Sequence, residues 1–238
     1  MKNPPRAILF DLDGTLADTA PDLAAAVNRL RTDHGLPPLP YEPLRAVASN
    51  GESGLIGAAF NLATNDAGYE KLCAAFLDHY GCAIATKTRL FDGIAPLLRT
   101  LTEKGLKWGI VTNKVARFSD LLVPQIGLHD AACVISGDTM PHAKPHPAPL
   151  LEAARRLALP PQDCWYVGDD LRDIQAGQAA GMTTIAAAWG YCGIAAPFTW
   201  HADAVVDLPL DILALLDQAH ENAPPRKRAP ETPFLSSM

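Results

Sequence analysis

The sequence predicts an α/β protein built on a parallel sheet, with a helical subdomain inserted near its start. The first observation is the alternation of short apolar runs with amphipathic or Ala/Leu-rich segments along residues 89–220, which is typical of βαβ units. The second is the stretch 18–88, which contains helical patterns but no convincing strand. Because a structureless loop of that length is uncommon in a compact domain, an inserted helical subdomain explains it better.

The individual elements follow from the same patterns. The expected strands are residues 7–10, 107–112, 132–136, 164–168, 183–188 and 203–207. The expected helices of the sheet region are residues 94–105, 116–127, 146–159, 173–181 and 210–220, and those of the insertion include 21–35 and 69–81. This places the sheet domain at 1–17 and 89–220, the helical subdomain at 18–88 and a disordered, Pro-rich tail at 221–238.

The bulk composition is that of an ordinary globular protein. Of the 238 residues, 48% are hydrophobic and 19% are charged, and the formal net charge of −6 argues against a nucleic-acid partner. No apolar run approaches the length of a membrane span, so no membrane partner is expected. The five cysteines are scattered without a CxxC pair, which indicates neither a disulfide framework nor a zinc site. A reducing cytoplasm is therefore the expected compartment.

Polar side chains that can carry chemistry follow several of the expected strands. Ligands in open parallel sheets bind beyond the carboxyl ends of the strands, so residues at these ends should meet at one edge. Paired carboxylates at the end of a buried strand are costly to desolvate, and a metal ion would offset that cost. The candidates are Asp11 and Asp13 after the first strand, Thr112 and Asn113 after the second, Lys144 between the third and fourth, and Asp169, Asp170 and Asp173 after the fourth.

This set of groups suits phosphoryl transfer to a carboxylate. Asp11 is the candidate nucleophile that would form an aspartyl-phosphate, and Asp13 is the candidate acid that protonates the leaving oxygen and later activates water. Because the carboxylate and the phosphate repel each other, a hard divalent cation must bridge them, and Mg²⁺ prefers oxygen ligands. Asp11 and Asp169 would supply carboxylates to the ion, and Asp13 its backbone carbonyl.

The remaining groups have candidate roles around the phosphate. Thr112, Asn113 and Lys144 would hold phosphate oxygens and balance charge in the transition state. Asp173 is either a first-turn helix charge or a group that holds a metal-bound water or orients Lys144. Asp170 is either a helix cap or a group behind the metal ligands.

Four motifs resemble, in order and position, those of the haloacid dehalogenase superfamily: DLDGT at 11–15, TN at 112–113, Lys144 before a proline, and GDDLRD at 168–173. The resemblance covers residues 5–220 and implies a Rossmann-like core, an aspartyl-phosphate mechanism with Mg²⁺ and a helical cap formed by residues 18–88. Asp13 matches the phosphatases and phosphomutases of the superfamily, whereas the haloacid dehalogenases themselves lack it.

Within that superfamily, FDLDGTLADTAPDLAAAVN and VTNKVARF are similar to the phosphoglycolate phosphatase group. VGDDLRDIQAG and WHADAVVDLPL are similar to its relatives that act on N-acetylmuramic acid 6-phosphate. The resemblance thus implies a Mg²⁺-dependent phosphomonoester hydrolase for a small phosphorylated metabolite. The first substrate to expect is N-acetylmuramic acid 6-phosphate of peptidoglycan recycling, with 2-phosphoglycolate as the alternative. At Asp170, GDD departs from the GDS more usual in phosphoglycolate phosphatases.

Two rival functions remain at this level, a sugar phosphomutase of the same fold and a binding protein on a retired enzyme scaffold. The retained, mutually repelling carboxylates argue against the second. In the expected cap, Ser49, Asn50, Gly51 and Glu52 form a polar, flexible break between helical patterns. That break is either an ordinary helix connection or a loop that reads the substrate. The sequence does not distinguish a monomer from a homodimer.

Overall fold

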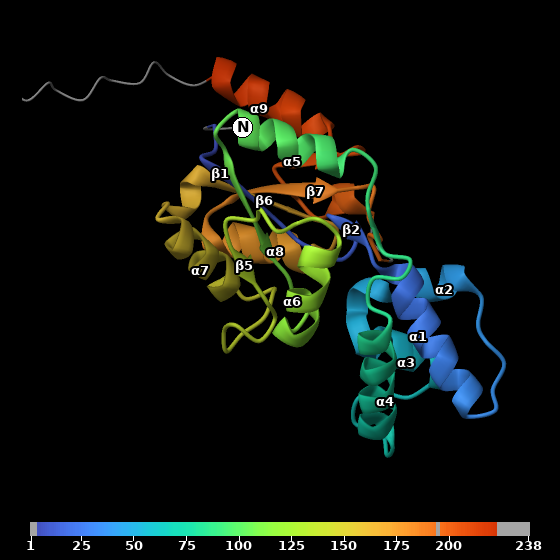
Figure 1. Cartoon of the computed structure of the whole chain (residues 1–238). Helices are drawn as coiled ribbons and strands as arrows, with labels where there is room; N and C mark the ends of the chain where they lie inside the picture. The colour runs from blue at the N-terminus through green and yellow to red at the C-terminus, as the bar shows by residue number, and fades with distance from the viewer. Residues whose placement is uncertain (1–3, 194–195, 223–238) are drawn as a thin grey trace, which may run out of the picture.

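A computed structural model describes residues 4–193 and 196–222, and a six-stranded sheet forms its centre (Figure 1). The strands are β1 (Ala7–Phe10), β4 (Lys107–Val111), β5 (Val134–Ile135), β6 (Cys164–Gly168), β7 (Thr183–Ala187) and β8 (Ala204–Val206). They are all parallel, in the order β5-β4-β1-β6-β7-β8. Ala7 of the central strand stands in register with Lys107 on one side and Cys164 on the other. The predicted α/β class and its six strands are confirmed.

Helices cover both faces of the sheet. Successive side chains of a strand point to opposite faces, and accordingly Ile8 and Phe10 of β1 lie in one buried cluster and Leu9 in another. The first face is covered by α5 (Ile94–Glu103), α6 (Ala116–Gln125) and α9 (Asp211–Glu221), and the second by α7 (Ala148–Leu157) and α8 (Leu171–Ala180). Burial on both faces explains why the strands are continuous apolar runs in the sequence.

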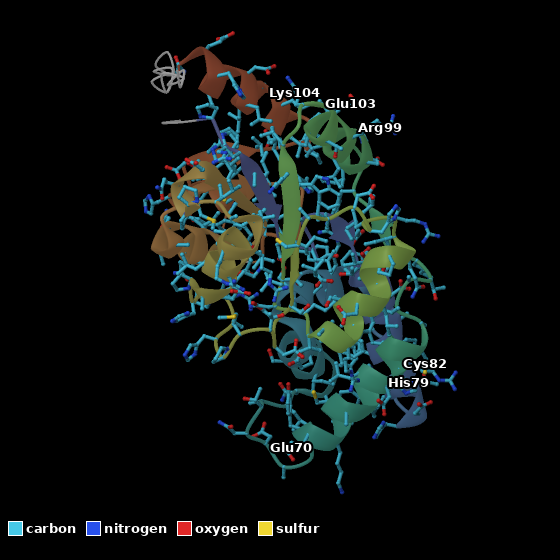
Figure 2. The ribbon with its side chains drawn as sticks, turned by 60° about the vertical axis from the view of Figure 1, so that its left-hand side comes forward. Glu70, His79, Cys82, Arg99, Glu103 and Lys104 are labelled. Carbon is cyan, nitrogen blue, oxygen red and sulfur yellow. The ribbon has the colours of Figure 1, made fainter. Side chains whose placement is uncertain are left out.

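An all-helical insertion follows the first strand. It begins and ends at two short strands, β2 (Ala17–Asp18) and β3 (Arg89–Leu90), which pair antiparallel and so bring the two connections together. Between them lie α1 (Ala20–Asp33), α2 (Tyr41–Arg45), α3 (Gly51–Phe60) and α4 (Tyr69–Cys82), with α1 packed against the other three. We call residues 18–88 the cap. Glu70, His79 and Cys82 of α4 lie at the opposite end of the molecule from Arg99, Glu103 and Lys104 near the end of α5 (Figure 2).

Two local predictions are wrong. The expected flexible break at residues 49–54 is ordered: Ala48–Asn50 is a 3₁₀ turn, and Gly51 begins α3, so Glu52 is helical. Polar residues suit this first helical turn because its N–H groups have no partner within the helix, while Leu55 and Ile56 farther along are buried. Helix α9 also runs to Glu221, into the predicted tail; residues 223–238 lie outside the described residues. No helix within 4–193 and 196–222 combines the length and apolarity needed to cross a membrane.

The two connections between cap and sheet are held together by one buried carboxylate. Asp22, near the start of α1, is 3% exposed. Its Oδ2 accepts hydrogen bonds from the backbone N–H groups of Lys87 and Thr88 at 2.9 and 2.8 Å and from Thr88 Oγ1 at 2.8 Å. The end of the cap is thereby fixed to its beginning.

Replacing this carboxylate should cost stability. We expect Asp22→Ala to lower the free energy of unfolding by about 2–3 kcal/mol, because it leaves buried N–H donors of residues 87 and 88 without an acceptor. Urea denaturation followed by circular dichroism measures the loss. Asp78→Ala is the matched control, since the Asp78 side chain is 81% exposed and its change should stay within about 0.5 kcal/mol. Equal midpoints for the two variants would contradict the role given to Asp22.

Candidate active site

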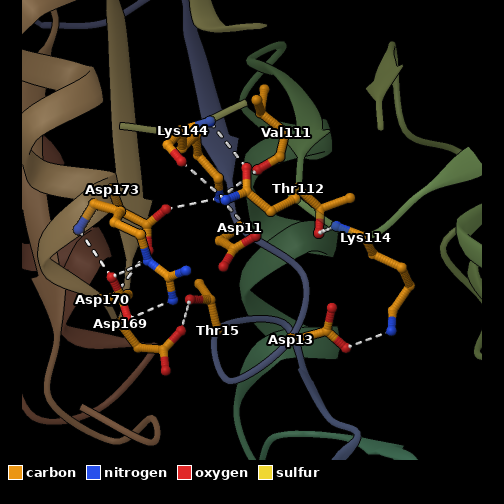
Figure 3. Close-up of polar contacts among 12 residues, drawn as sticks. Asp11, Asp13, Thr15, Val111, Thr112, Lys114, Lys144, Asp169, Asp170 and Asp173 are labelled. Atoms are coloured by element: carbon orange, nitrogen blue, oxygen red, sulfur yellow. Dashed lines mark hydrogen bonds and ion pairs between the residues drawn. The ribbon is translucent and has the colours of Figure 1, made fainter. Parts of the chain in front are cut away.

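The carboxyl edge of the sheet brings the predicted site residues together (Figure 3). Asp11 follows β1, Thr112 follows β4 and Asp169 follows β6, so three neighbouring strands deliver them to one place. The turn after β1 contains Gly14, whose φ of +84° is a left-handed conformation that favours glycine. A Cβ on Gly14 would lie 2.2 Å from Asp169 Oδ2, so the absence of a side chain lets the ends of β1 and β6 approach closely.

Lys144 is buried at the centre of this edge. Its ammonium lies 2.8 Å from Asp11 Oδ1 and 2.7 Å from Asp173 Oδ1. It also donates to the Val111 carbonyl at 3.0 Å and to the Tyr166 hydroxyl at 2.8 Å. Burial would lower the pKa of the lysine, but Asp11 and Asp173 outweigh burial and raise that pKa to about 12. Lys144 is therefore a fixed positive charge beside Asp11.

The side chain of Asn113 holds the backbone of Lys144. Asn113 Oδ1 accepts from the Lys144 backbone N–H at 3.0 Å, and Asn113 Nδ2 donates to the Lys144 carbonyl at 3.0 Å. These two bonds hold the loop that carries Lys144 and leave one N–H of the amide without a partner among the described residues, so the contact of Asn113 with phosphate stays a prediction. Thr112 also lines the cavity, and its hydroxyl accepts the Lys114 N–H at 3.1 Å; its contact with phosphate likewise stays a prediction.

Three carboxylates converge beside Lys144. Among the described residues, Asp11, Asp169 and Asp173 form an acidic group in which one oxygen from each lies within 4.8 Å of the others. Burial, opposed by Lys144, raises the pKa of Asp11 to about 7. Burial, together with the charges of Asp11 and Asp173, raises the pKa of Asp169 well above its usual range. Keeping all three buried carboxylates ionised is therefore unfavourable, and a cation bound between them would stabilise their ionised forms.

Hydrogen bonds aim Asp169 into this group. Its Oδ1 accepts from Thr15 Oγ1 at 2.7 Å and its Oδ2 from the Tyr191 N–H at 2.9 Å. The hydroxyl of the same tyrosine accepts from the first N–H groups of the cap, those of Thr19 and Ala20, at 2.7 and 2.8 Å. Tyr191 therefore connects the carboxylate directly to the point where the cap begins.

Asp170 caps helix α8. Its carboxylate accepts from the Arg172 backbone N–H at 2.9 Å and forms an ion pair with the guanidinium at 2.7 Å, while Asp173 Oδ2 accepts from the Asp170 N–H at 3.1 Å in a capping box. Burial would raise the pKa of Asp170, but Arg172 lowers it overall. Of the two alternatives left open for Asp170, the helix cap is the one observed. Arg172 also donates to the Ser49 carbonyl of the cap at 2.6 Å.

Asp13 points away from the acidic group, toward Lys114 (Figure 3). Its Oδ1 accepts from Thr19 Oγ1 and lies 3.1 Å from the ammonium of Lys114, which follows β4. The ammonium also donates to the Tyr80 hydroxyl of α4 at 3.0 Å. Lys114 and Arg172 were not among the predicted site residues. The position of Lys114 directly after the TN motif could have marked it as a site residue. The contacts of Lys114 and Arg172 with the cap depend on tertiary packing, which no local sequence pattern reveals.

A cavity of about 390 Å³ lies between the sheet edge and the cap. Its polar floor contains Asp11, Thr112 and Lys144, and the predicted cap residues Ser49–Glu52 line its opposite wall. Apolar side chains complete the lining, contributed by α1, α4 and α6: Leu23, Phe76, Leu77 and Phe118. A parallel sheet that gathers carboxylates and a buried lysine at the floor of a covered cavity defines an α/β enzyme.

Comparison with known proteins identifies the enzyme family of this chain. The family model of the haloacid dehalogenase-like hydrolases matches residues 8–187. A phosphoglycolate phosphatase of Xanthomonas campestris is 45% identical over 207 residues, covering 86% of this chain and 93% of the relative. An N-acetylmuramic acid 6-phosphate phosphatase of Pseudomonas aeruginosa is 40% identical over 216 residues, covering 90% and 96%.

A solved structure agrees with these relatives. The crystal structure of a predicted phosphoglycolate phosphatase from Haemophilus somnus superposes with a TM-score of 0.81 at 27% identity, covering 90% of this chain and 98% of that one. The chain belongs to the haloacid dehalogenase-like hydrolase family and stands among its phosphatases. The resemblance drawn from the four motifs is confirmed, and so is the prediction of an enzyme.

Proposed function

We propose that this protein is a Mg²⁺-dependent phosphomonoester hydrolase that acts through an aspartyl-phosphate on Asp11. The observation that carries the proposal is the position of Asp11 at the floor of the cavity, 2.8 Å from the Lys144 ammonium and within the acidic group. A carboxylate that attacks a phosphate dianion needs positive charge beside it; Lys144 supplies one such charge, and a cation held by the acidic group would supply another.

The donor set fits a hard divalent ion. Asp11, Asp169 and Asp173 offer only oxygen atoms, and the one partner of the buried Asp11 Oδ1 among the described residues is the Lys144 ammonium, at 2.8 Å. Mg²⁺ uses one or two carboxylates together with phosphate oxygens and water. Asp11 and Asp169 would hold the ion, with the Asp13 carbonyl as the further predicted ligand, because both oxygens of Asp173 already accept hydrogen bonds, Oδ1 from Lys144 and Oδ2 from the Asp170 N–H. When bound, the ion neutralises the repulsion between the phosphate and the carboxylates.

The residues of the chain divide the chemistry between them. Asp11 attacks phosphorus while Asp13, on the cap side, protonates the leaving oxygen. Lys144 and Thr112 hold the equatorial phosphate oxygens during transfer. Asp13, now ionised, then removes a proton from the water that hydrolyses the aspartyl-phosphate. The cap excludes bulk water during both steps.

The cavity supports a sugar-sized substrate. Its 390 Å³ falls in the range of roughly 300–1,000 Å³ that is typical of small-molecule sites. The Ser49 hydroxyl is buried and has no hydrogen-bond partner among the described residues, so it remains available to a ligand. We therefore keep N-acetylmuramic acid 6-phosphate as the first substrate to test, with 2-phosphoglycolate as the alternative and Ser49, Asn50, Gly51 and Glu52 as the specificity segment.

A panel of phosphomonoesters tests the function. Inorganic phosphate released in the presence of Mg²⁺ is measured for N-acetylmuramic acid 6-phosphate, 2-phosphoglycolate and common sugar phosphates, and kcat/KM values are compared. Release from one of them far above the rest supports the hydrolase and names its substrate. Conversion of a sugar phosphate to its isomer without phosphate release would instead identify a phosphomutase.

Metal binding should depend on pH. Because the pKa of Asp11 without metal is raised to about 7, this ligand is protonated below pH 7 and must lose its proton to bind an ion. We expect the apparent affinity for Mg²⁺ to fall at least about tenfold for each pH unit below 7, and binding at pH 6 to release at least one proton, because the pKa of the second ligand, Asp169, is raised as well. Calorimetry in buffers of different protonation enthalpy measures that release. Asp11→Asn should reduce the proton release, and a pH-independent affinity would contradict the prediction.

A further inference from the structure

We propose that Lys114 is a specificity-determining residue, which binds a carboxylate carried by the leaving group of the substrate. The proposal rests on the proposed phosphatase function and deepens it, because it names a chemical feature that the substrate must have. The proposal rests on the buried Lys114 ammonium at the cap side of the cavity, which has one N–H donor without an acceptor among the described residues.

Lys114 is enclosed where cap and sheet meet. Its side chain is 7% exposed and lines the cavity. The ammonium lies 3.1 Å from Asp13 Oδ1, donates to the Tyr80 hydroxyl at 3.0 Å and stands 4.7 Å from the centre of the Tyr80 ring. An ammonium has three N–H donors, and the described residues provide acceptors for two of them. One donor is left for a ligand.

The other two basic side chains of the cavity differ in this capacity: Lys144 lacks it, whereas Arg172 retains free donors on Nη1. The Lys144 ammonium already has Val111, Tyr166 and Asp173 as hydrogen-bond acceptors, in addition to its ion pair with Asp11. The Arg172 guanidinium is bound twice by Asp170 and once by the Ser49 carbonyl. Within the described part of the chain, Lys114 and the Nη1 group of Arg172 are therefore the cavity cations that can accept a new anionic partner, and of the two it is Lys114 that contacts Asp13.

The position of Lys114 selects the leaving group as that partner. Asp13 is the proposed proton donor to the leaving oxygen, and Lys114 contacts Asp13 from one side and Tyr80 of α4 from the other. A group bound to Lys114 is therefore attached to the leaving oxygen rather than to phosphorus. A carboxylate placed near Asp11 or Asp170 would be repelled, whereas beside Lys114 the ammonium offsets the negative charge of Asp13.

Two sources would supply this carboxylate. Glycolate and muramic acid, the leaving groups in the names of the relatives above, are both carboxylic acids. In 2-phosphoglycolate the carboxylate is adjacent to the carbon that bears the phosphate, whereas in N-acetylmuramic acid 6-phosphate it is on the lactyl ether across the sugar ring. Lys114 would bind the carboxylate that both compounds share. Pairs of substrates with and without that carboxylate show which of the two compounds supplies it.

The experiment compares substrates with and without the carboxylate, which in the muramic sugar is removed together with the rest of its lactyl group. The pairs are 2-phosphoglycolate with ethylene glycol monophosphate, and N-acetylmuramic acid 6-phosphate with N-acetylglucosamine 6-phosphate. For wild type we expect kcat/KM to favour the acid by about 10- to 100-fold in one pair, the range of one charge-assisted hydrogen bond. Lys114→Met should bring that ratio close to one, largely through KM, and Lys114→Arg should restore part of it. Tyr80→Phe, which keeps the positive charge, should preserve the ratio.

Each result decides the proposal. The pair that responds names the source of the carboxylate. Equal losses on both members of each pair in Lys114→Met would show a merely structural lysine, and a wild type without preference in either pair would overturn the proposal even if that variant fails to fold. Failure of wild type to release phosphate from all four esters would contradict the proposed function itself, and with it the role of Lys114.

Discussion

Asp11→Asn is expected to abolish phosphate release, with kcat reduced by a factor of at least about 10⁴, the scale on which removal of a nucleophile acts. The amide is similar in size and shape to the carboxyl group but cannot form the aspartyl-phosphate. Acid-quenched reactions with ³²P-labelled substrate should show labelled protein for wild type and none for the variant. Residual turnover within a factor of about 100 of wild type would contradict the assignment of Asp11 as nucleophile.

The variant should remain folded. The raised pKa of Asp11 shows that its ionised form is disfavoured in the fold, so a neutral amide removes a cost, and Lys144 keeps its contact with Asp173. Asp163→Asn is the matched control, because Asp163 precedes β6 at the opposite edge of the sheet. We expect that control to retain wild-type kcat/KM and an unchanged melting temperature.

Lys144→Met should have the largest effect on stability. The ammonium is the cation that balances two buried carboxylates, Asp11 and Asp173, and removing one partner of such a group costs about 3–5 kcal/mol. Phosphate release should be lost as well, since the charge that holds the phosphate is gone. Chemical denaturation at pH 8 measures the loss of stability.

A double-mutant cycle shows whether that loss comes from the buried charges. Asp173→Asn should cancel part of the cost in the double variant, with a coupling of at least about 1 kcal/mol. Lys104→Met is the control: its side chain is 46% exposed in a 3.4 Å ion pair with Asp217, so a change of less than about 0.5 kcal/mol is expected. Equal effects at positions 104 and 144 would show that the buried ammonium does not balance these carboxylates.

The sheet and the floor of the site could be predicted because both depend on local patterns. A strand buried on both faces is a continuous apolar run, and the parallel arrangement places whatever follows each run at one edge. This reasoning located Asp11, Lys144 and Asp169. It also left open whether Asp173 orients the lysine; the two side chains lie 2.7 Å apart, which agrees with that alternative.

What could not be predicted depends on contacts between distant segments. The two hydrogen bonds between the Asn113 side chain and the Lys144 backbone were not predicted, because these residues lie beside each other only in the folded chain. Lys114 is placed by Tyr80, and Arg172 by Ser49, across the boundary with the cap. The predicted break at 49–54 is helical because burial of Leu55 and Ile56 outweighs the turn preference of glycine and serine.

The central place of β1 determines the order in which this protein can assemble. The strand stands at the start of the chain, yet its two neighbours begin at Lys107 and Cys164. During synthesis the cap is complete before either neighbour exists, and the first strand waits with both backbone edges open until most of the chain has been made. Pairings so distant in sequence form slowly and expose the strand to wrong partners. The same topology that brings Asp11 between two supporting strands thus makes its strand the most vulnerable segment of the nascent chain.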